Sequence, residues 1–119
     1  MLKPLRITVH APGPDHCVVT VVGELDVVTA AELRAALQQA VTTYPRTVVD
    51  LAGVAFCDCT GLSALLAASR RARERGAVLW LRSVPYAVAR LLRLTHTRNA
   101  FTIESRHCCP ARAPQPTRW

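Results

Sequence analysis

The sequence predicts an α/β domain in which a mixed, largely parallel β-sheet packs with α-helices. Apolar, β-branched runs of strand length alternate with amphipathic stretches of helical period. Because helices separate most consecutive strands, right-handed crossovers are expected to join those strands in parallel. The chain has 119 residues and 50% of them are hydrophobic, which suits a single domain with its own core.

The first two predicted strands have no helix between them. Residues 6–10 alternate in hydropathy as a short strand does, and residues 11–15, with two prolines and a glycine, predict a turn. Residues 17–22 are a nearly continuous β-branched run, which predicts a strand buried on both faces. The short connection requires these two strands to be antiparallel, as in a hairpin.

A first helix is expected to follow the loop of residues 23–26. Thr29 is a favoured N-cap, and Glu32 three residues later gives the stretch the form of a capping box. Tyr44 and Pro45 end the helix. Its apolar side chains recur at helical spacing and predict one buried face, made of Leu33, Ala36, Leu37, Ala40 and Val41.

The centre of the chain predicts a strand followed directly by a second helix. Residues 47–51 form a buried strand that continues after Gly53 through residues 54–57. The helix then runs to about Arg75 and stops at Gly76, a favoured C′ residue. Small and apolar side chains share its inner face, at Leu62, Leu65, Leu66, Ala68, Ser69 and Ala72.

The last elements are a strand, a helix and a short strand. Residues 77–81 predict the strand, Ser83 is the expected N-cap of the helix, and Asn99 closes that helix. Residues 101–103 form the final strand. The apolar stripe of the helix is expected at Val84, Val88, Leu91 and Leu92.

Beyond these elements the composition changes. From Ser105 onward the chain has three prolines and no hydrophobic periodicity, which predicts a flexible C-terminal tail over residues 105–119. The folded domain is therefore expected to occupy residues 1–104. There are no internal repeats.

The net charge of +7 is distributed unevenly. Residues 1–60 carry four basic and six acidic side chains, whereas residues 61–119 carry eleven basic and two acidic ones. A basic half can attract nucleic acid or an acidic protein, but solvated helix faces explain most of these arginines. Nucleic-acid binding needs aromatic platforms or a recognition helix, and Trp80 is expected in the core, so no direct nucleic-acid contact is predicted.

Five cysteines are present, at positions 17, 57, 59, 108 and 109. An odd number without a recognisable secretory signal or membrane span predicts a cytoplasmic protein without a disulfide framework. The first three lie in or beside apolar strands and are interpreted as small hydrophobes. A zinc site from Cys57 and Cys59 with His107, Cys108 or Cys109 has unsuitable spacing, so neither metal nor cofactor is expected.

The motif Asp58-Cys59-Thr60-Gly61-Leu62 stands between the predicted buried strand and the second helix. Thr60 is interpreted as the helix N-cap. Backbone N–H groups and the positive end of the helix dipole favour an anion there, so a hydroxyl beside Asp58 suits a phosphate that is added and removed. The motif predicts a switch rather than a catalytic centre.

Enzymatic alternatives have little support. The chain has no glycine-rich phosphate loop and no nucleophile elbow, and its four histidines form no recognisable constellation. The strongest enzymatic alternative is Cys59 as a thiol nucleophile at a helix start, but neither a histidine nor a resolving cysteine is suitably placed. The protein is not expected to be an enzyme.

Four stretches of the chain resemble segments of one known family. Residues 23–26 (GELD) resemble the motif before the first helix of bacterial anti-sigma factor antagonists, and residues 48–62 resemble that family's hallmark stretch. Residues 71–79 and 88–95 resemble its later segments. Because the likeness runs in order from residue 5 to residue 104, the chain resembles a STAS domain, the module shared by sulphate transporters and anti-sigma factor antagonists.

The resemblance implies a mechanism of regulation. Antagonists of this family bind an anti-sigma factor that is also a serine/threonine kinase, and the sigma factor is released. The kinase phosphorylates a Ser or Thr before the motif glycine, which breaks the complex, and a phosphatase restores it. By position, Thr60 before Gly61 is the phospho-acceptor, Asp58 is the motif acid and Asp26 is the second acid. Cys59 stands where the family commonly has serine.

The resemblance also leaves alternatives open. The main one is a STAS scaffold that signals by protein contact alone, without phosphorylation. A nucleotide-binding variant and a homodimer are further alternatives. No membrane association is expected.

Overall fold

A computed structural model of the chain describes residues 5–104, in which five strands form one sheet in chain order. The strands are β1 (Arg6–Gly13), β2 (His16–Leu25), β3 (Arg46–Cys57), β4 (Val78–Arg82) and β5 (Thr102–Glu104). β1 is antiparallel to β2, and the other three pairings are parallel. The predicted fold class, a mixed and largely parallel sheet, is therefore confirmed.

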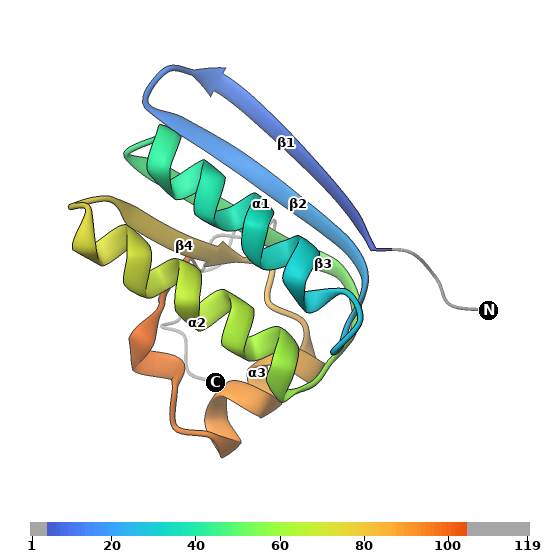
Figure 1. The fold of residues 1–119 in the computed structure, drawn as a ribbon. Coiled ribbons are helices and arrows are strands. Elements are labelled where there is room, and N and C mark those ends of the chain that lie inside the picture. Colours follow the sequence, from blue (N-terminus) through green and yellow to red (C-terminus); the bar gives the residue numbers. More distant parts are fainter. Residues whose placement is uncertain (1–4, 105–119) are drawn as a thin grey trace, which may run out of the picture.

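Helices provide the crossovers between the parallel strands. They are α1 (Ala30–Thr43), α2 (Cys59–Glu74) and α3 (Tyr86–Leu94), and a short 3₁₀ helix, η1 (Arg98–Ala100), precedes β5. α1 and α2 lie side by side across one face of the sheet (Figure 1). No helix of the described part is long and apolar enough to span a membrane.

The core lies between the sheet and the pair α1 and α2. Alternate residues of the strands are fully buried there, including Val19, Val49 and Leu81, and they share a core cluster with Leu37 of α1 and Leu65 of α2. The inner face predicted for α2 is buried except for a partly buried Leu66. Burial of this apolar surface is the main free-energy term that favours the fold.

The opposite face of the sheet is open, which corrects two predictions. β2 is buried on one face only, because Val18 and Thr20 on the other face are half-buried. Trp80 is not a core residue but lies half-buried on that open face with Val18 and Val48. Both differences arise because α1 and α2 cover the same face and leave the other uncovered. The hydropathy of a single strand does not show which face the helices will cover.

The end of α2 agrees with the sequence. Gly76 has φ +73°, a value that favours glycine, and its N–H donates to the carbonyl of Arg73. The N–H of Ala77 donates to the carbonyl of Ala72 at 2.7 Å. These two bonds form a Schellman motif, so the predicted stop at Gly76 is confirmed.

The third helix is shorter than predicted. It begins at Tyr86 after an N-cap at Pro85, and Ser83 instead has φ 56° in the preceding turn. The residue before a proline avoids the helical region, which excludes Val84 from the helix. The helix ends at Leu94, and Asn99 belongs to η1.

The boundaries of the first two strands also differ from the prediction. The pairing of β1 with β2 continues to Gly13 and His16, and the pairing of β2 with β3 carries β2 on to Leu25. Residues 1–4 and the predicted tail, residues 105–119, lie outside the described residues.

Candidate functional site

The two acids named by the sequence lie at the same edge of the sheet. Leu25 and Cys57 are paired at the carboxyl ends of β2 and β3. The N–H of Asp58 donates to the carbonyl of Leu25 at 3.0 Å, which ties the two strand ends together. Asp26 and Asp58 each directly follow one of these paired strand ends, so they lie next to each other at this edge of the sheet. We call the region formed by residues 24–29 and 56–61 the strand-end site.

Asp58 is the N-cap of α2, which corrects the assignment of that role to Thr60. Its Oδ1 accepts hydrogen bonds from the N–H of Thr60 at 2.9 Å and from that of Gly61 at 3.0 Å. Asp58 has the extended backbone that an N-cap needs, whereas Thr60 is already the second helical residue. A carboxylate therefore satisfies two of the N–H groups that the sequence had assigned to an incoming phosphate.

The Thr60 side chain projects from the first turn of α2. Thr60 and Cys59 are exposed, and Asp58 behind them is half-buried. Because Thr60 does not cap the helix, changes at its hydroxyl leave the capping bonds of Asp58 in place. A large group can therefore be attached at this position without unpacking the core.

Asp26 organises the loop before α1. Its Oδ1 accepts hydrogen bonds from the N–H groups of Val28 at 3.0 Å and Thr29 at 3.1 Å. The Thr29 hydroxyl donates to the carbonyl of Glu24 at 2.8 Å, so it faces back to β2 and makes no capping bond. Thr29 is the N-cap residue of α1, as predicted, but the capping box predicted with Glu32 is wrong. Asp26 is a turn-former and a member of the strand-end site.

Gly61 is required by close packing. A Cβ at this position would lie 2.6 Å from the Leu25 Cβ and 3.1 Å from the Leu25 carbonyl oxygen. The first turn of α2 thus rests directly on the end of β2. Only glycine permits this approach, which fixes the position of Thr60 relative to the loop that follows β2.

The two cysteines of the site have different environments. Cys57 is buried, and this burial, with the nearby negative charges of Asp58 and Cys59, raises the pKa of its thiol to about 12. Cys17 is buried as well, but Cys59 is exposed, so the interpretation of Cys59 as a small core hydrophobe is wrong. Residues 5–104 contain no group of three potential metal ligands, and the other proposed zinc ligands lie outside the described residues.

Three apolar residues of this region were not identified from the sequence. Val27 is 70% exposed and Val28 is 65% exposed in the loop after β2, and Phe56 of β3 is 47% exposed. Apolar side chains that cluster beside polar groups on a surface are typical of protein-binding sites. The signal available in the sequence was the Val27-Val28 pair, which lies between a strand and a helix and belongs to the apolar pattern of neither.

Comparison with known proteins identifies the family. A model described as "Mlab, STAS domain" matches residues 10–99. A solved anti-sigma factor antagonist from Mycobacterium paratuberculosis is 27% identical, with a TM-score of 0.76 over 89% of this chain and 92% of that chain.

Two more distant structures share the fold. The anti-sigma factor antagonist SpoIIAA in its unphosphorylated form is 13% identical, with a TM-score of 0.68 over 86% of this chain and 90% of that chain. A putative antagonist from Thermotoga maritima is 20% identical, with a TM-score of 0.69 over 84% and 83% of the two chains. The family match over most of the chain and the shared five-stranded architecture lead to one conclusion: this chain belongs to the STAS domain family.

Proposed function

We propose that this protein is an anti-sigma factor antagonist that binds an anti-sigma factor kinase and so frees a sigma factor. Phosphorylation of Thr60 switches it off, and a phosphatase restores it. The observation that carries the proposal is the exposed hydroxyl-bearing residue at the second position of α2, beside the Asp58 cap. In this role the chain is a regulator that supplies the acceptor, and the kinase supplies the catalysis.

The strand-end site supports a partner surface at the same place. Val27, Val28 and Phe56 offer exposed apolar area, and Asp26 and Asp58 add negative charge next to it. Apolar contacts supply affinity when a partner covers them, and charges at the rim set orientation and association rate. A kinase that docks here has its active site next to Thr60.

The proposed switch acts by charge. Transfer of the γ-phosphoryl group of ATP to the Thr60 oxygen releases ADP and the hydroxyl proton, and it adds a charge of about −1.5 to −2. Two N–H groups of the helix start already bind Asp58, so they are not free to neutralise this phosphate. Repulsion between the phosphate, Asp58 and the partner then disfavours the complex.

The solved relatives support the proposal. The mycobacterial relative is itself an anti-sigma factor antagonist. SpoIIAA is known in an unphosphorylated and a phosphorylated form, each with the fold of this chain. An antagonist of this architecture therefore accommodates a phosphoryl group.

The test is phosphorylation by the cognate kinase with ATP, followed by location of the phosphate by mass spectrometry. We expect one phosphate on Thr60, no phosphate on Thr60→Val, and phosphate again on Thr60→Ser. Ser63, one turn along and also exposed, supplies the matched control, because Ser63→Ala should be phosphorylated normally. Phosphate on Ser63 would refute the assignment of Thr60.

A kinase-binding measurement distinguishes this function from that of a scaffold. Thr60→Val should hold the kinase in the presence of ATP, and Thr60→Glu should bind it more weakly than the unmodified chain does. If the chain binds the kinase and is never phosphorylated, it is a scaffold that acts by contact alone.

A further inference from the structure

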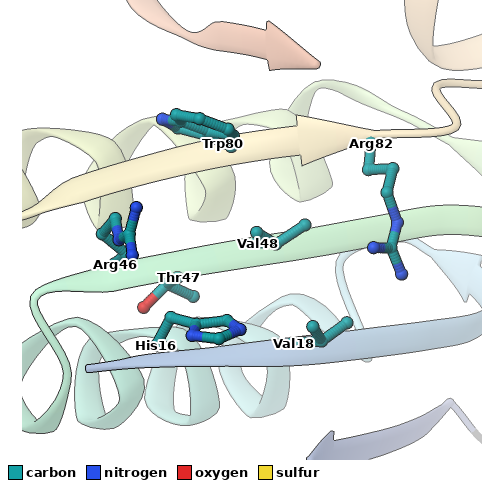
Figure 2. A pocket seen from close by; sticks show the side chains of 7 residues that line it. All are labelled: His16, Val18, Arg46, Thr47, Val48, Trp80 and Arg82. Atoms are coloured by element: carbon teal, nitrogen blue, oxygen red, sulfur yellow. The ribbon is translucent and has the colours of Figure 1, made fainter. Parts of the chain in front are cut away.

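The open face of the sheet contains a cavity of about 230 Å³. It is lined by residues of three adjacent strands, namely His16, Val18, Arg46, Thr47, Val48, Trp80 and Arg82 (Figure 2). His16 and Arg46 stand at the starts of β2 and β3, whereas the strand-end site lies at their carboxyl ends. His16 is nine residues of extended strand, about 30 Å, from Leu25, whereas Arg82 at the other end of the cavity is level with Thr20, five residues or about 17 Å from Leu25.

The cavity combines an apolar floor with cationic walls. Val18 and Val48 lie at its centre on β2 and β3, and the Trp80 indole stands over the β4 side (Figure 2). Arg46 lies at one end of this floor and Arg82 at the other. The aromatic ring and the two valines suit a flat apolar group, and the guanidinium groups suit a negative charge at its rim.

The existing ion pairs leave hydrogen-bonding capacity for an anion. Arg46 Nη2 lies 3.4 Å from Asp15 Oδ2, and both side chains are more than half exposed. This ion pair therefore contributes little to stability, and a ligand carboxylate can replace Asp15 in it. Arg82 lies 3.0 Å from Asp50 and is held over β3 by that contact. A guanidinium has five N–H donors, so the bond to Asp50 leaves other donors of Arg82 available.

The volume limits the size of the ligand. A cavity of about 150 Å³ holds a benzene molecule, whereas sites for drug-sized ligands measure about 300–1,000 Å³. The 230 Å³ found here accommodates one ring with one small acidic group.

We propose that this cavity binds a small aromatic carboxylate. The ring contacts Val18, Val48 and Trp80, and the carboxylate accepts charge-assisted hydrogen bonds from Arg46. This site is independent of the strand-end site and of the proposed function.

The test is a titration of the full chain with benzoate, followed by ¹H–¹⁵N NMR. Trp119→Phe is used as background, because the chain has two tryptophans and this change leaves Trp80 as the only indole N–H signal. We expect the Trp80 indole and the amides of Val18 and Val48 to shift and to saturate at or below about 10 mM, with the amides of residues 56–61 unchanged.

Ligand analogues and matched variants determine which interactions matter. Benzamide, which lacks the charge, and cyclohexanecarboxylate, which lacks the aromatic ring, should each bind more weakly than benzoate, benzamide by about tenfold. Arg46→Gln should weaken benzoate by about tenfold, whereas Arg70→Gln on the exposed surface of α2 removes the same charge and should have no effect. Retention of the amide spectrum shows that each variant is folded.

Other outcomes overturn the proposal. Shifts that do not saturate, equal binding of benzoate and benzamide, or an equal loss in Arg46→Gln and Arg70→Gln would each show that the cavity does not select an aromatic carboxylate. Displacement of benzoate by equimolar inorganic phosphate would show that charge alone is recognised, and the proposal would again fail.

Discussion

At the scale of single residues, Asp58 links stability to the proposed switch. Its carboxylate caps α2 through two hydrogen bonds, and its own N–H is held by the carbonyl of Leu25. The group that organises the helix start is therefore also the negative charge that a phosphate on Thr60 meets. If Thr60 were the cap, its hydroxyl would have to accept the capping hydrogen bonds and also receive the phosphate. Because the cap is Asp58, two residues earlier, the Thr60 hydroxyl is not needed for capping.

Asp58→Ala should lower the free energy of unfolding by about 1 kcal/mol, because two N–H groups of α2 lose their acceptor. Asp58→Asn keeps a side-chain oxygen in place and should recover most of that loss. Urea denaturation followed by circular dichroism measures both. A stability for Asp58→Ala equal to that of the unmodified chain would contradict the capping role.

Cys59 and Cys57 should differ sharply toward iodoacetamide at pH 8. Cys59 is exposed and should be alkylated, whereas Cys57 is buried with a pKa raised to about 12, so little reactive thiolate is present. Peptide mapping by mass spectrometry distinguishes the two sites. Denaturation in urea should make Cys57 reactive, and modification of native Cys57 at the rate of Cys59 would contradict its burial.

At the scale of elements, the strand-end site depends on how α2 is seated on the sheet. The contact between Gly61 and Leu25 brings the first turn of α2 against the end of β2, and the antiparallel and parallel neighbours of β2 hold that strand in place. The helix stop at Gly76 has a different basis, since it depends on the conformation of the backbone and not on close contact.

These two glycines should respond differently to alanine. Gly61→Ala brings a Cβ to 2.6 Å from that of Leu25, which no rotamer can relieve, and overpacking of this kind costs about 1–3 kcal/mol. Gly76→Ala meets no atom within 4 Å, but its φ of +73° should cost about 1 kcal/mol. Gly76→Asn tolerates that backbone better and should recover part of the loss. Urea denaturation measures these losses, and no recovery of stability in Gly76→Asn relative to Gly76→Ala would contradict the backbone origin of the effect at Gly76.

At the scale of the whole molecule, the acids of the strand-end site and the arginines of α2 lie at opposite ends of that helix. The strand-end site carries Asp26 and Asp58, whereas the exposed arginines of α2 lie in its last turns, at Arg70, Arg71 and Arg73. The 16 residues of α2 are about 24 Å long, so these arginines are distant from Thr60. The arginines of α2 are therefore separated from the acids of the strand-end site, whereas Arg90 and Arg93 are exposed on α3, beside the start of α2 (Figure 1).

Residues 1–104 should fold without the predicted tail. The core cluster of the described residues extends from Leu5 to Phe101, so its packing is internal to this segment. We expect the fragment 1–104 to unfold in one cooperative transition with the urea midpoint of the full chain within error. A clear loss of stability would show that residues 105–119 pack against the domain and would move the domain boundary.

The sequence by itself determined the element order, the fold class and the place of the motif from Asp58 to Leu62, because these follow from hydrophobic period and local turn chemistry. It also marked the stop at Gly76, which depends on one residue's own conformational freedom. The predicted start of α3 at Ser83 was wrong, because Pro85 takes the N-cap position. The predicted capping box at Thr29 was wrong, because the Thr29 hydroxyl bonds to the carbonyl of Glu24 instead.

Only the tertiary structure decided which groups meet. It paired Leu25 with Cys57 and so joined Asp26 to the helix start of Thr60, two segments that are 34 residues apart in the chain. It also placed both long helices on one face of the sheet and left Trp80 beside Arg46 and Arg82 on the other. Local patterns cannot specify such contacts, because side-chain period shows that a strand has two faces but not which of them the crossovers will cover.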